Sequence, residues 1–446
     1  MNSKNLIQSK ALYAAIAAIC MSLLLLVSCD GEKSGKGAAY DPSRPIVLTS
    51  FHPDSGGMAS KVIFDGENFG SDPDKIKVYF NQKLAPVIGS SGKRMYTTVP
   101  RLPGDTCTVS VVVGNDSVVY DQKFRYKVAV TVSTIAGNGV NNVFQAGILD
   151  QSTFQPHALC LDGDGNLFSL VRNNNGGFIK INEEENSCIE LANSSQGIVW
   201  TGVPCVDMST GVITFPSDHV RELFWTFDPR EGWAFRQRYM KWKEGAAIEP
   251  PSDPWKKSTA SCKVNGYFYT HFYNGHIVKI HPKTYEAEVI YIVPSQGECY
   301  GLAFHPLRPT MLYMTSYNNA GSLAHSISCF DVTDPAGTFQ KLTGATSGGH
   351  RDGEVALSQF NNPTQLFFDP DGNLYIADSG NHCIRRLNTE TNMVETVVGI
   401  PGTSGWKDGG KDEALFNTPW GITVSADGTV YVGDYGNSRI RKLAIE

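Results

Sequence analysis

The chain has 446 residues and a formal net charge of −6, with 38 Lys and Arg against 44 Asp and Glu. This length allows two or three domains, and the acidic excess argues against nucleic-acid binding, which requires a basic surface. The 44 glycines and 23 prolines, with only 18% charged residues, indicate many turns and few long amphipathic helices. The composition therefore predicts an all-β protein and excludes disorder and coiled coil.

The N-terminal stretch has the pattern of an export signal. Lys4 and Lys10 precede an apolar run over residues 11–27, and Ser28 separates this run from Cys29. A basic start, an apolar segment and small residues before a cut site are typical of a secretory signal. The stretch resembles the lipobox of bacterial lipoproteins, which implies a signal peptide over residues 1–28 and acylation of Cys29, for example with palmitate. The alternative is a membrane anchor that is never cleaved.

Two acidic residues, Asp30 and Glu32, follow the cysteine. They resemble the acidic tag that directs lipoproteins of the Bacteroidetes to the cell surface. The resemblance implies a protein that is anchored in the outer membrane by lipid and faces the cell exterior. Two or more acyl chains on one cysteine hold a protein on a bilayer where a single chain does not.

A flexible tether is predicted over residues 29–44, and short β-rich runs separated by turn residues follow as far as residue 127. Such runs are typical of a β-sandwich. Gly56-Gly57, then Gly66 and Phe69-Gly70 resemble the IPT/TIG family of immunoglobulin-like domains. The resemblance implies a sandwich over residues 45–127 that acts as a spacer without chemistry of its own.

The rest of the chain, residues 128–446, repeats itself. The interval of roughly 45–60 residues is the length of a propeller blade. Residues 155–181, 362–387 and 418–442 closely resemble NHL repeats, and three degenerate copies lie between residues 203 and 342. Six copies predict a six-bladed NHL-type propeller. The strand near 130–137 matches the missing fourth strand of the last copy, so we expect it to close the ring and remove exposed sheet edges.

One face of such a propeller carries the connections between blades and the turns between second and third strands; we call it the crossing face. Its long loops suit binding, and aromatic rings there suit the apolar faces of sugars. The insertion over residues 241–261 departs most from the repeat and is the favoured local region. For Trp406, packing between blades is at least as good an interpretation as ligand contact. For Trp420, which opens an inner strand, packing and a place on the channel wall are equally good interpretations. The candidate ligand-binding residues are Trp200, Trp242, Trp255, Tyr273, Tyr300, Tyr317, Trp406, Trp420 and Tyr435.

Catalytic and metal motifs give a weaker signal. The sequence has no GxSxG, P-loop or HExxH motif, and we predict no catalytic residue and no cofactor. His157, His271 and His382 map to the crossing face in alternate blades, where three imidazoles suit a zinc ion as in some NHL-like propeller enzymes. His382 also fits a turn position that NHL repeats fill for structural reasons, so the sequence favours no metal.

Ten cysteines occur in the sequence. Apart from Cys20 in the signal and Cys29, they are scattered without CxxC spacing, which argues against a zinc site built on thiolates. Several lie inside strand-like runs, where a thiol behaves as a small apolar residue. We therefore expect mostly free, buried cysteines.

The sequence favours a surface lipoprotein that binds extracellular polysaccharide on the crossing face, without catalysis, and serves a glycan-uptake system. The implied partners are the polysaccharide, outer-membrane lipid through Cys29 and an outer-membrane transporter complex, with no nucleic acid. Two alternatives stay open. One is a protein–protein scaffold of an outer-membrane complex, and the other is a metal-dependent propeller lyase or hydrolase.

Overall fold

The computed structural model of the chain describes residues 37–102, 106–127, 129–141, 144–172, 176–199 and 201–445. The predicted signal peptide with Cys29, and the candidate Trp200, lie outside these ranges. The chain divides into two compact units, residues 1–127 and 128–446. None of the helices in the described ranges is long and apolar enough to cross a lipid bilayer.

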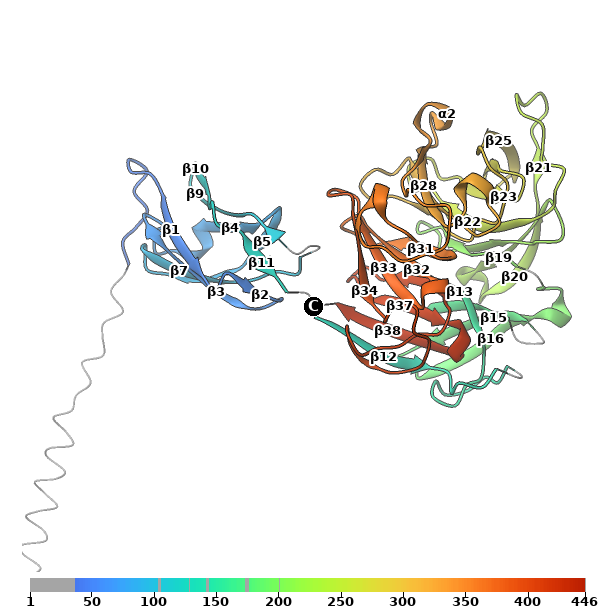
Figure 1. The fold of residues 1–446 in the computed structure, drawn as a ribbon, viewed down its shortest axis with the longest axis horizontal. Helices are drawn as coiled ribbons and strands as arrows, with labels where there is room; N and C mark the ends of the chain where they lie inside the picture. Colours follow the sequence, from blue (N-terminus) through green and yellow to red (C-terminus); the bar gives the residue numbers. More distant parts are fainter. Residues whose placement is uncertain are drawn as a thin grey trace, which may run out of the picture. The chain divides into compact units, whose positions relative to one another are not determined.

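The first unit is an immunoglobulin-like sandwich (Figure 1). One sheet has the order β1-β3-β7-β6, a second the order β10-β9-β4-β5, and β2, β11 and β8 form a small third sheet. Buried and exposed residues alternate along the strands, as in β4 and β9, because one face of each sheet covers the core. The strands are β1 (Val47–His52), β2 (Ser55–Gly56), β3 (Lys61–Glu67), β4 (Ile76–Phe80), β5 (Lys83–Ala85), β6 (Val87–Ser90), β7 (Arg94–Thr98), β8 (Thr106–Cys107), β9 (Val109–Val113), β10 (Asp116–Val119) and β11 (Phe124–Tyr126).

Aromatic rings fill the core of the sandwich. Phe51, Phe64, Phe80 and Phe124 are at most 3% exposed. Phe80 and Phe124 meet edge to face with ring centroids 5.1 Å apart, and Phe51 meets Tyr120 in the same way at 5.2 Å. Edge-to-face pairs of this kind add to the stability gained from burial alone.

The last residues of the expected tether, 40–44, contact the sandwich. Tyr40 donates a hydrogen bond from its hydroxyl to Asp116 Oδ2 at 2.8 Å. The side-chain amide of Asn68 donates to the carbonyl oxygens of Asp41 and Arg44, at 2.9 and 2.6 Å. These contacts hold residues 40–44 on the sandwich, which is the physical reason that this part of the predicted tether is not free.

The second unit is a propeller of six sheets, each built on four antiparallel strands (Figure 1). In the first five sheets these four strands follow chain order, and in the sixth the outermost of the four, β12 (Val130–Ala136), comes first in the chain. Three blades carry an additional two-residue strand along the outer edge: β21 (Lys241–Trp242), β30 (Gly353–Glu354) and β35 (Gly409–Gly410). Blade by blade, the strands are β13 (Pro156–Leu161), β14 (Leu167–Val171), β15 (Gly177–Asn182) and β16 (Ser187–Asn193); β17 (Cys205–Val206), β18 (Ile213–Pro216), β19 (Leu223–Asp228) and β20 (Ala234–Tyr239); β22 (Lys256–Ser261), β23 (Phe268–Phe272), β24 (His276–Ile280) and β25 (Glu286–Ile292); β26 (Leu302–Phe304), β27 (Met311–Ser316), β28 (Ser326–Asp331) and β29 (Gln340–Lys341); β31 (Pro363–Phe368), β32 (Asn373–Asp378), β33 (Cys383–Asn388) and β34 (Met393–Val398); and β36 (Pro419–Val424), β37 (Val430–Asp434), β38 (Arg439–Ile445) and β12 (Val130–Ala136).

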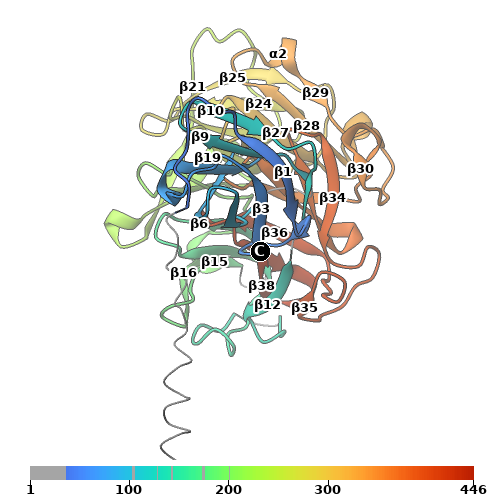
Figure 2. The ribbon, with the colours of Figure 1, turned by 90° about the vertical axis from the view of Figure 1, so that its left-hand side faces the viewer.

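The ring closes as the sequence predicts. The strand β12, which precedes all the other propeller strands in the chain, pairs with β38 at the C-terminal end, with Val132 opposite Leu443. In Figure 1 the teal β12 runs beside the red β38, and the two lie together again in Figure 2. The inner strand of each blade contacts that of the next around the whole ring, including β36 of the sixth blade against β13 of the first. The predicted all-β fold, a sandwich followed by a six-bladed propeller, is confirmed.

The turns between first and second strands explain why the NHL pattern is visible in the sequence. Asp369 accepts hydrogen bonds at Oδ1 from the backbone N–H groups of Asp371 and Asn373, at 3.0 and 2.9 Å. Asp162 does the same in the first blade. An aspartate that caps its own turn, followed by glycine, fixes the hairpin. Short helical segments fill other connections: α2 (Pro335–Thr338), η1 (Pro73–Lys75), η2 (Ser194–Gln196), η3 (Pro229–Glu231), η4 (Gly321–Leu323), η5 (Val355–Leu357), η6 (Ser379–Asn381) and η7 (Tyr435–Asn437).

The cysteines of the described ranges are free thiols, as expected. All of them are buried except Cys205, which is half-buried. Burial raises the pKa of Cys188 and of Cys299 to about 12, so these thiols remain protonated and unreactive.

Candidate functional site

Side chains from the beginning of four inner strands meet at the crossing face. His157, Lys257 and Trp420 are the second residues of β13, β22 and β36, and Tyr300 lies two residues before β26. The backbones of neighbouring blades approach closely here. A Cβ atom on Gly421 would lie 2.7 Å from the carbonyl oxygen of His157, so only glycine fits at that position. This approach brings residues of different blades within contact distance.

Four of the predicted aromatic residues gather around His157; with it they form what we call the axial aromatic cluster. Trp420 stacks on His157 with ring centroids 3.5 Å apart and planes at 28°. Tyr300 lies edge-on to Trp420 at 4.6 Å and to Tyr317 at 5.2 Å. Tyr435 lies edge-on to His157 at 6.0 Å. The cluster therefore joins the first, fourth and sixth blades.

The members of this cluster differ in how far solvent reaches them. Trp420 is only 7% exposed, since His157 covers one face of the indole and Tyr300 approaches it edge-on. Trp420 is thus packed, and it supports the other rings. Tyr300, Tyr317 and Tyr435 are half-buried, so these three phenol rings are the parts of the cluster that a ligand can touch.

Beside the aromatic cluster lies an axial charged triad formed by Lys257, Asp218 and Glu298. The ammonium group of Lys257 is 2.6 Å from Asp218 Oδ2 and 3.3 Å from Glu298 Oε1. Side-chain exposure is 14% for Lys257, 6% for Asp218 and 20% for Glu298. The sequence analysis missed all three, because each belongs to a different blade and no spacing along the chain links them.

Electrostatics keep the imidazole of His157 neutral. Burial lowers the pKa of His157 well below its ordinary value, and the positive charges of Arg172 and Lys257 lower it further. A neutral imidazole offers one nitrogen as a donor and the other as an acceptor. Burial, and then the negative charge of Glu298, raise the pKa of Tyr300, so its phenol stays protonated. The site thus presents hydroxyl, imidazole, ammonium and carboxylate groups with little net charge.

The other predicted aromatic residues lie elsewhere. Trp255 is 46% exposed and meets Tyr273 edge to face at 5.4 Å, which makes a separate ring pair on the third blade. Trp242 lies in the outer strand β21 and donates its indole N–H to Glu222 at 3.2 Å. Trp406 is 52% exposed, yet its ring face is covered by the guanidinium group of Arg439 at 3.8 Å. Among the candidate residues in the described ranges, Tyr300, Tyr317, Trp420 and Tyr435 therefore meet in one cluster, and Trp255 and Tyr273 form a separate pair.

The three candidate metal ligands do not converge. His271 is buried in β23, where burial lowers its pKa to about 3. His382 accepts a hydrogen bond at Nδ1 from the backbone N–H of Thr418 at 2.9 Å, so it links the fifth and sixth blades. His325 makes the equivalent bond in the fourth blade. Across the described ranges, no three His, Cys, Asp or Glu side chains are grouped closely enough to hold a metal ion.

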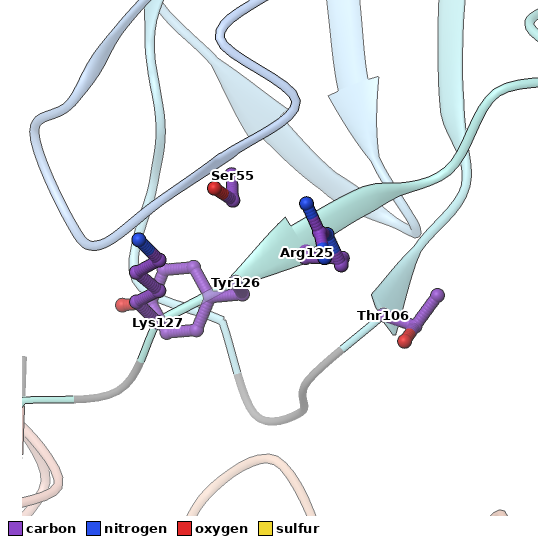
Figure 3. A pocket seen from close by; sticks show the side chains of 5 residues that line it. All are labelled: Ser55, Thr106, Arg125, Tyr126 and Lys127. Atoms are coloured by element: carbon purple, nitrogen blue, oxygen red, sulfur yellow. The ribbon is translucent and has the colours of Figure 1, made fainter.

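The sandwich carries a pocket (Figure 3). Figure 3 shows Tyr126 and Lys127 at one end of it and Thr106 at the other. The guanidinium group of Arg125 in this pocket forms an ion pair with Asp54 Oδ2 at 2.9 Å, and the Arg125 side chain is largely exposed to solvent. The pocket's charged side chains, Arg125 and Lys127, are exposed, whereas those of the axial charged triad are largely buried, so the propeller is the stronger candidate site. The lining residues are Ser55, Thr106, Arg125, Tyr126 and Lys127.

Comparison with known proteins identifies the parts of the chain. Residues 45–126 match the IPT/TIG domain family, and residues 360–387 and 416–443 match the NHL repeat. These NHL matches cover the fifth and sixth blades, two of the three copies that the sequence analysis singled out.

Curated relatives share only a short stretch with the chain. Protein SUPPRESSOR OF QUENCHING 1 of Arabidopsis thaliana is 36% identical over 95 residues, which are 21% of this chain and 9% of that protein. NHL repeat-containing protein 2 of Bos taurus is 35% identical over 121 residues, 25% of this chain and 16% of that protein. The matched stretch thus spans less than a fifth of either relative.

Solved structures cover nearly the whole chain. A protein of unknown function from Bacteroides thetaiotaomicron is 25% identical, with a TM-score of 0.70, over 92% of this chain and 100% of that one. An auxiliary nutrient binding protein from the same species is 22% identical, with a TM-score of 0.58, over 92% and 99% of the two chains. A protein of the same name from Bacteroides ovatus is also 22% identical, with a TM-score of 0.59, over 92% and 100%. The chain thus combines an IPT/TIG domain with an NHL-repeat propeller, an arrangement similar to that of solved proteins from Bacteroides.

Proposed function

We propose that this chain is a lipoprotein of the bacterial cell surface that binds extracellular polysaccharide on the crossing face of its propeller, without catalysis. The observation that carries the proposal is the meeting of half-buried tyrosine rings with the axial charged triad at the start of the inner strands. Sugars bind to such sites through their apolar ring faces and their hydroxyl groups. The nutrient-binding proteins of the same fold support this class of ligand.

The exposed pair formed by Trp255 and Tyr273 supplies a second contact for a longer glycan. The backbone N–H of Gly297 donates to the Tyr273 carbonyl oxygen at 2.7 Å, and Glu298 of the charged triad follows directly in the chain. The pair and the triad are therefore neighbours on the third and fourth blades. A polysaccharide that reaches both the triad and this pair would place an internal sugar against the exposed indole of Trp255.

The N-terminal sequence supports the proposed location. An apolar segment followed by Cys29, with Asp30 and Glu32 beyond it, suits lipid anchoring at the outer membrane and display to the exterior. A protein held there would present glycan to an outer-membrane transporter complex. Incorporation of labelled palmitate into the protein, and its loss in Cys29→Ser, tests the anchor; digestion of the protein by protease added to intact cells tests its exposure.

Affinity electrophoresis tests the binding function. The purified chain from residue 37 onward, which contains both compact units, is run through gels that contain different neutral and acidic polysaccharides. We expect at least one polysaccharide to retard it relative to a protein that binds no glycan. Retardation by none of them would contradict the proposal. Co-purification of a stoichiometric outer-membrane protein without any glycan affinity would favour the scaffold alternative.

A further inference from the structure

Two nearly buried side chains at the crossing face each keep one polar atom without a hydrogen-bond partner among the described residues. They are Asp218, 4% exposed, with its free Oδ1, and His157, 6% exposed, with its free Nδ1. A buried polar atom without a partner destabilises the folded state, so each such atom requires an explanation. One explanation is that the partner is a ligand.

Both atoms belong to the same small region. Lys257 binds Asp218 through Oδ2 at 2.6 Å, and its ammonium group lies 6.0 Å from the ring centroid of Tyr300. The ring of His157 lies 6.5 Å from the same centroid. Asp218 of the second blade and His157 of the first blade therefore lie in one region, linked through Lys257 and Tyr300.

The charges of this region balance. The cations Lys257 and Arg172 both act on His157, while the carboxylates of Asp218 and Glu298 both pair with Lys257. A charged ligand would find no excess of the opposite charge there. The free Oδ1 needs a hydrogen-bond donor, and a neutral imidazole nitrogen needs either a donor or an acceptor. A hydroxyl group is both, so the hydroxyls of a sugar suit both atoms.

We infer that the axial site holds the end of a neutral glycan, one sugar residue whose hydroxyls bind Asp218 and His157 beside the Tyr300 ring. This inference rests on the proposed function and specifies its ligand. An end is required because Asp218 and His157 are more than nine-tenths buried among side chains of several blades. The half-buried Tyr435 lies edge-on to His157, in the solvent-accessible part of the cluster. An internal sugar, substituted on both sides, cannot reach so deep.

Saturation-transfer NMR on the purified chain with free glucose, galactose, mannose, xylose and N-acetylglucosamine tests the inference. We expect transfer to at least one of these sugars, and about tenfold weaker binding of that sugar by Asp218→Asn, which replaces the free carboxylate oxygen with a poorer acceptor. Asp164→Asn is the matched control, because this exposed carboxylate lies in the turn between β13 and β14, away from the crossing face. No transfer to any of the sugars, or equal binding by Asp218→Asn, would overturn the inference.

A second comparison does not depend on the folding of a variant. The wild-type chain is titrated with galactose and galacturonic acid, or with glucose and glucuronic acid, which differ in one carboxylate. We expect the neutral sugar of the bound pair to bind more tightly, and tighter binding of the uronic acid would contradict the claim that the ligand is neutral.

The outcomes separate this inference from the proposed function. Retardation by a polysaccharide without transfer to any free sugar would remove the axial site and keep the proposed function. Binding of free sugars without retardation by any polysaccharide would keep the axial sugar site and contradict the binding of polysaccharide.

Discussion

His157 of the first blade stacks on Trp420 of the last blade, with ring centroids 3.5 Å apart. The pair therefore links the two ends of the repeat array on the crossing face, close to the axial charged triad. Because Tyr300 of the fourth blade approaches the same indole at 4.6 Å, the stack also supports a ring that faces the proposed ligand. Ring closure and the shape of the candidate site thus depend on the same side chains.

Removal of the central indole should destabilise the propeller strongly. Trp420→Ala deletes a side chain that is 7% exposed, and loss of a buried aromatic side chain costs about 3–5 kcal/mol. Trp406→Ala is the matched control, since this indole is 52% exposed, and we expect a loss of about 1 kcal/mol or less. Denaturant unfolding measures both. Equal losses in the two variants would contradict the packed role of Trp420.

The repeat architecture could be predicted because local chemistry fixes each blade. The Asp-Gly turns at Asp162 and Asp369 cap their own backbone, so the same residues recur at the same place in the sequence. The closing strand could be predicted because its alternation, with Val130 and Val132 buried, resembles the fourth strands of other blades. The short outer strand that contains Trp242 could not be predicted, because a strand of two residues is too short to show a periodic pattern in the sequence.

The candidate site could be predicted only in part. Tyr300 and Trp420 occupy equivalent positions in their repeats, so the sequence placed them on one face. Asp218 lies in a degenerate blade, and Lys257 lies in the insertion that departs from the repeat, so the repeat pattern could not be followed to either residue in the sequence. Their ion pair joins residues 39 positions apart in the sequence, and it becomes visible only when the inner strands are placed side by side.

The closing strand should be essential to the propeller. Val132 is 2% exposed and lies opposite Leu443, so Val132→Asp would bury an unpaired charge at the closure of the ring. We expect this variant to lose most of its cooperative unfolding transition. Thr131→Asp places the same carboxylate on the exposed side of the same strand, and it should unfold like the wild type. The melting of β-sheet circular dichroism measures both, and a normal transition in Val132→Asp would contradict closure by β12.

The fifth blade depends on a buried ion pair. Arg385 and Asp378 have side chains that are 0% exposed and lie 2.8 Å apart. Arg385→Met would leave the Asp378 carboxylate without its cation, at a cost of about 3–5 kcal/mol in unfolding free energy. The exposed pair of Arg44 and Glu67 is the comparison, for which Arg44→Met should cost less than about 1 kcal/mol. Denaturant titration of the two variants decides, and similar small losses would show that the buried pair contributes little.

A buried lysine should make stability rise in alkaline solution. Burial lowers the pKa of Lys256 to about 7, and its side-chain nitrogen lies 2.7 Å from the carbonyl oxygens of Ser217 and of Val220. A neutral amine has two N–H donors, which match these two acceptors. Between pH 7 and the ordinary lysine pKa, the unfolded chain binds a proton that the folded chain does not, so stability rises with pH.

Lys256→Met removes this titration. Between pH 7 and pH 9 we expect the wild type to gain about 2 kcal/mol relative to Lys256→Met, measured by denaturant unfolding at each pH. Other groups titrate equally in both proteins and cancel in the comparison. A constant difference between the two proteins over this range would show that Lys256 keeps its ordinary pKa in the folded state.

Calorimetric titration of the retarding polysaccharide, or of an oligosaccharide cut from it, tests the central claim most directly. The wild type is compared with Tyr317→Ala and Tyr435→Ala on the crossing face, and with Leu307→Ala, an exposed residue of the turn between β26 and β27. Loss of a stacking ring should weaken binding at least about tenfold, while Leu307→Ala should bind like the wild type. Unchanged affinity in both tyrosine variants, or an equal loss in Leu307→Ala, would contradict glycan binding at this site.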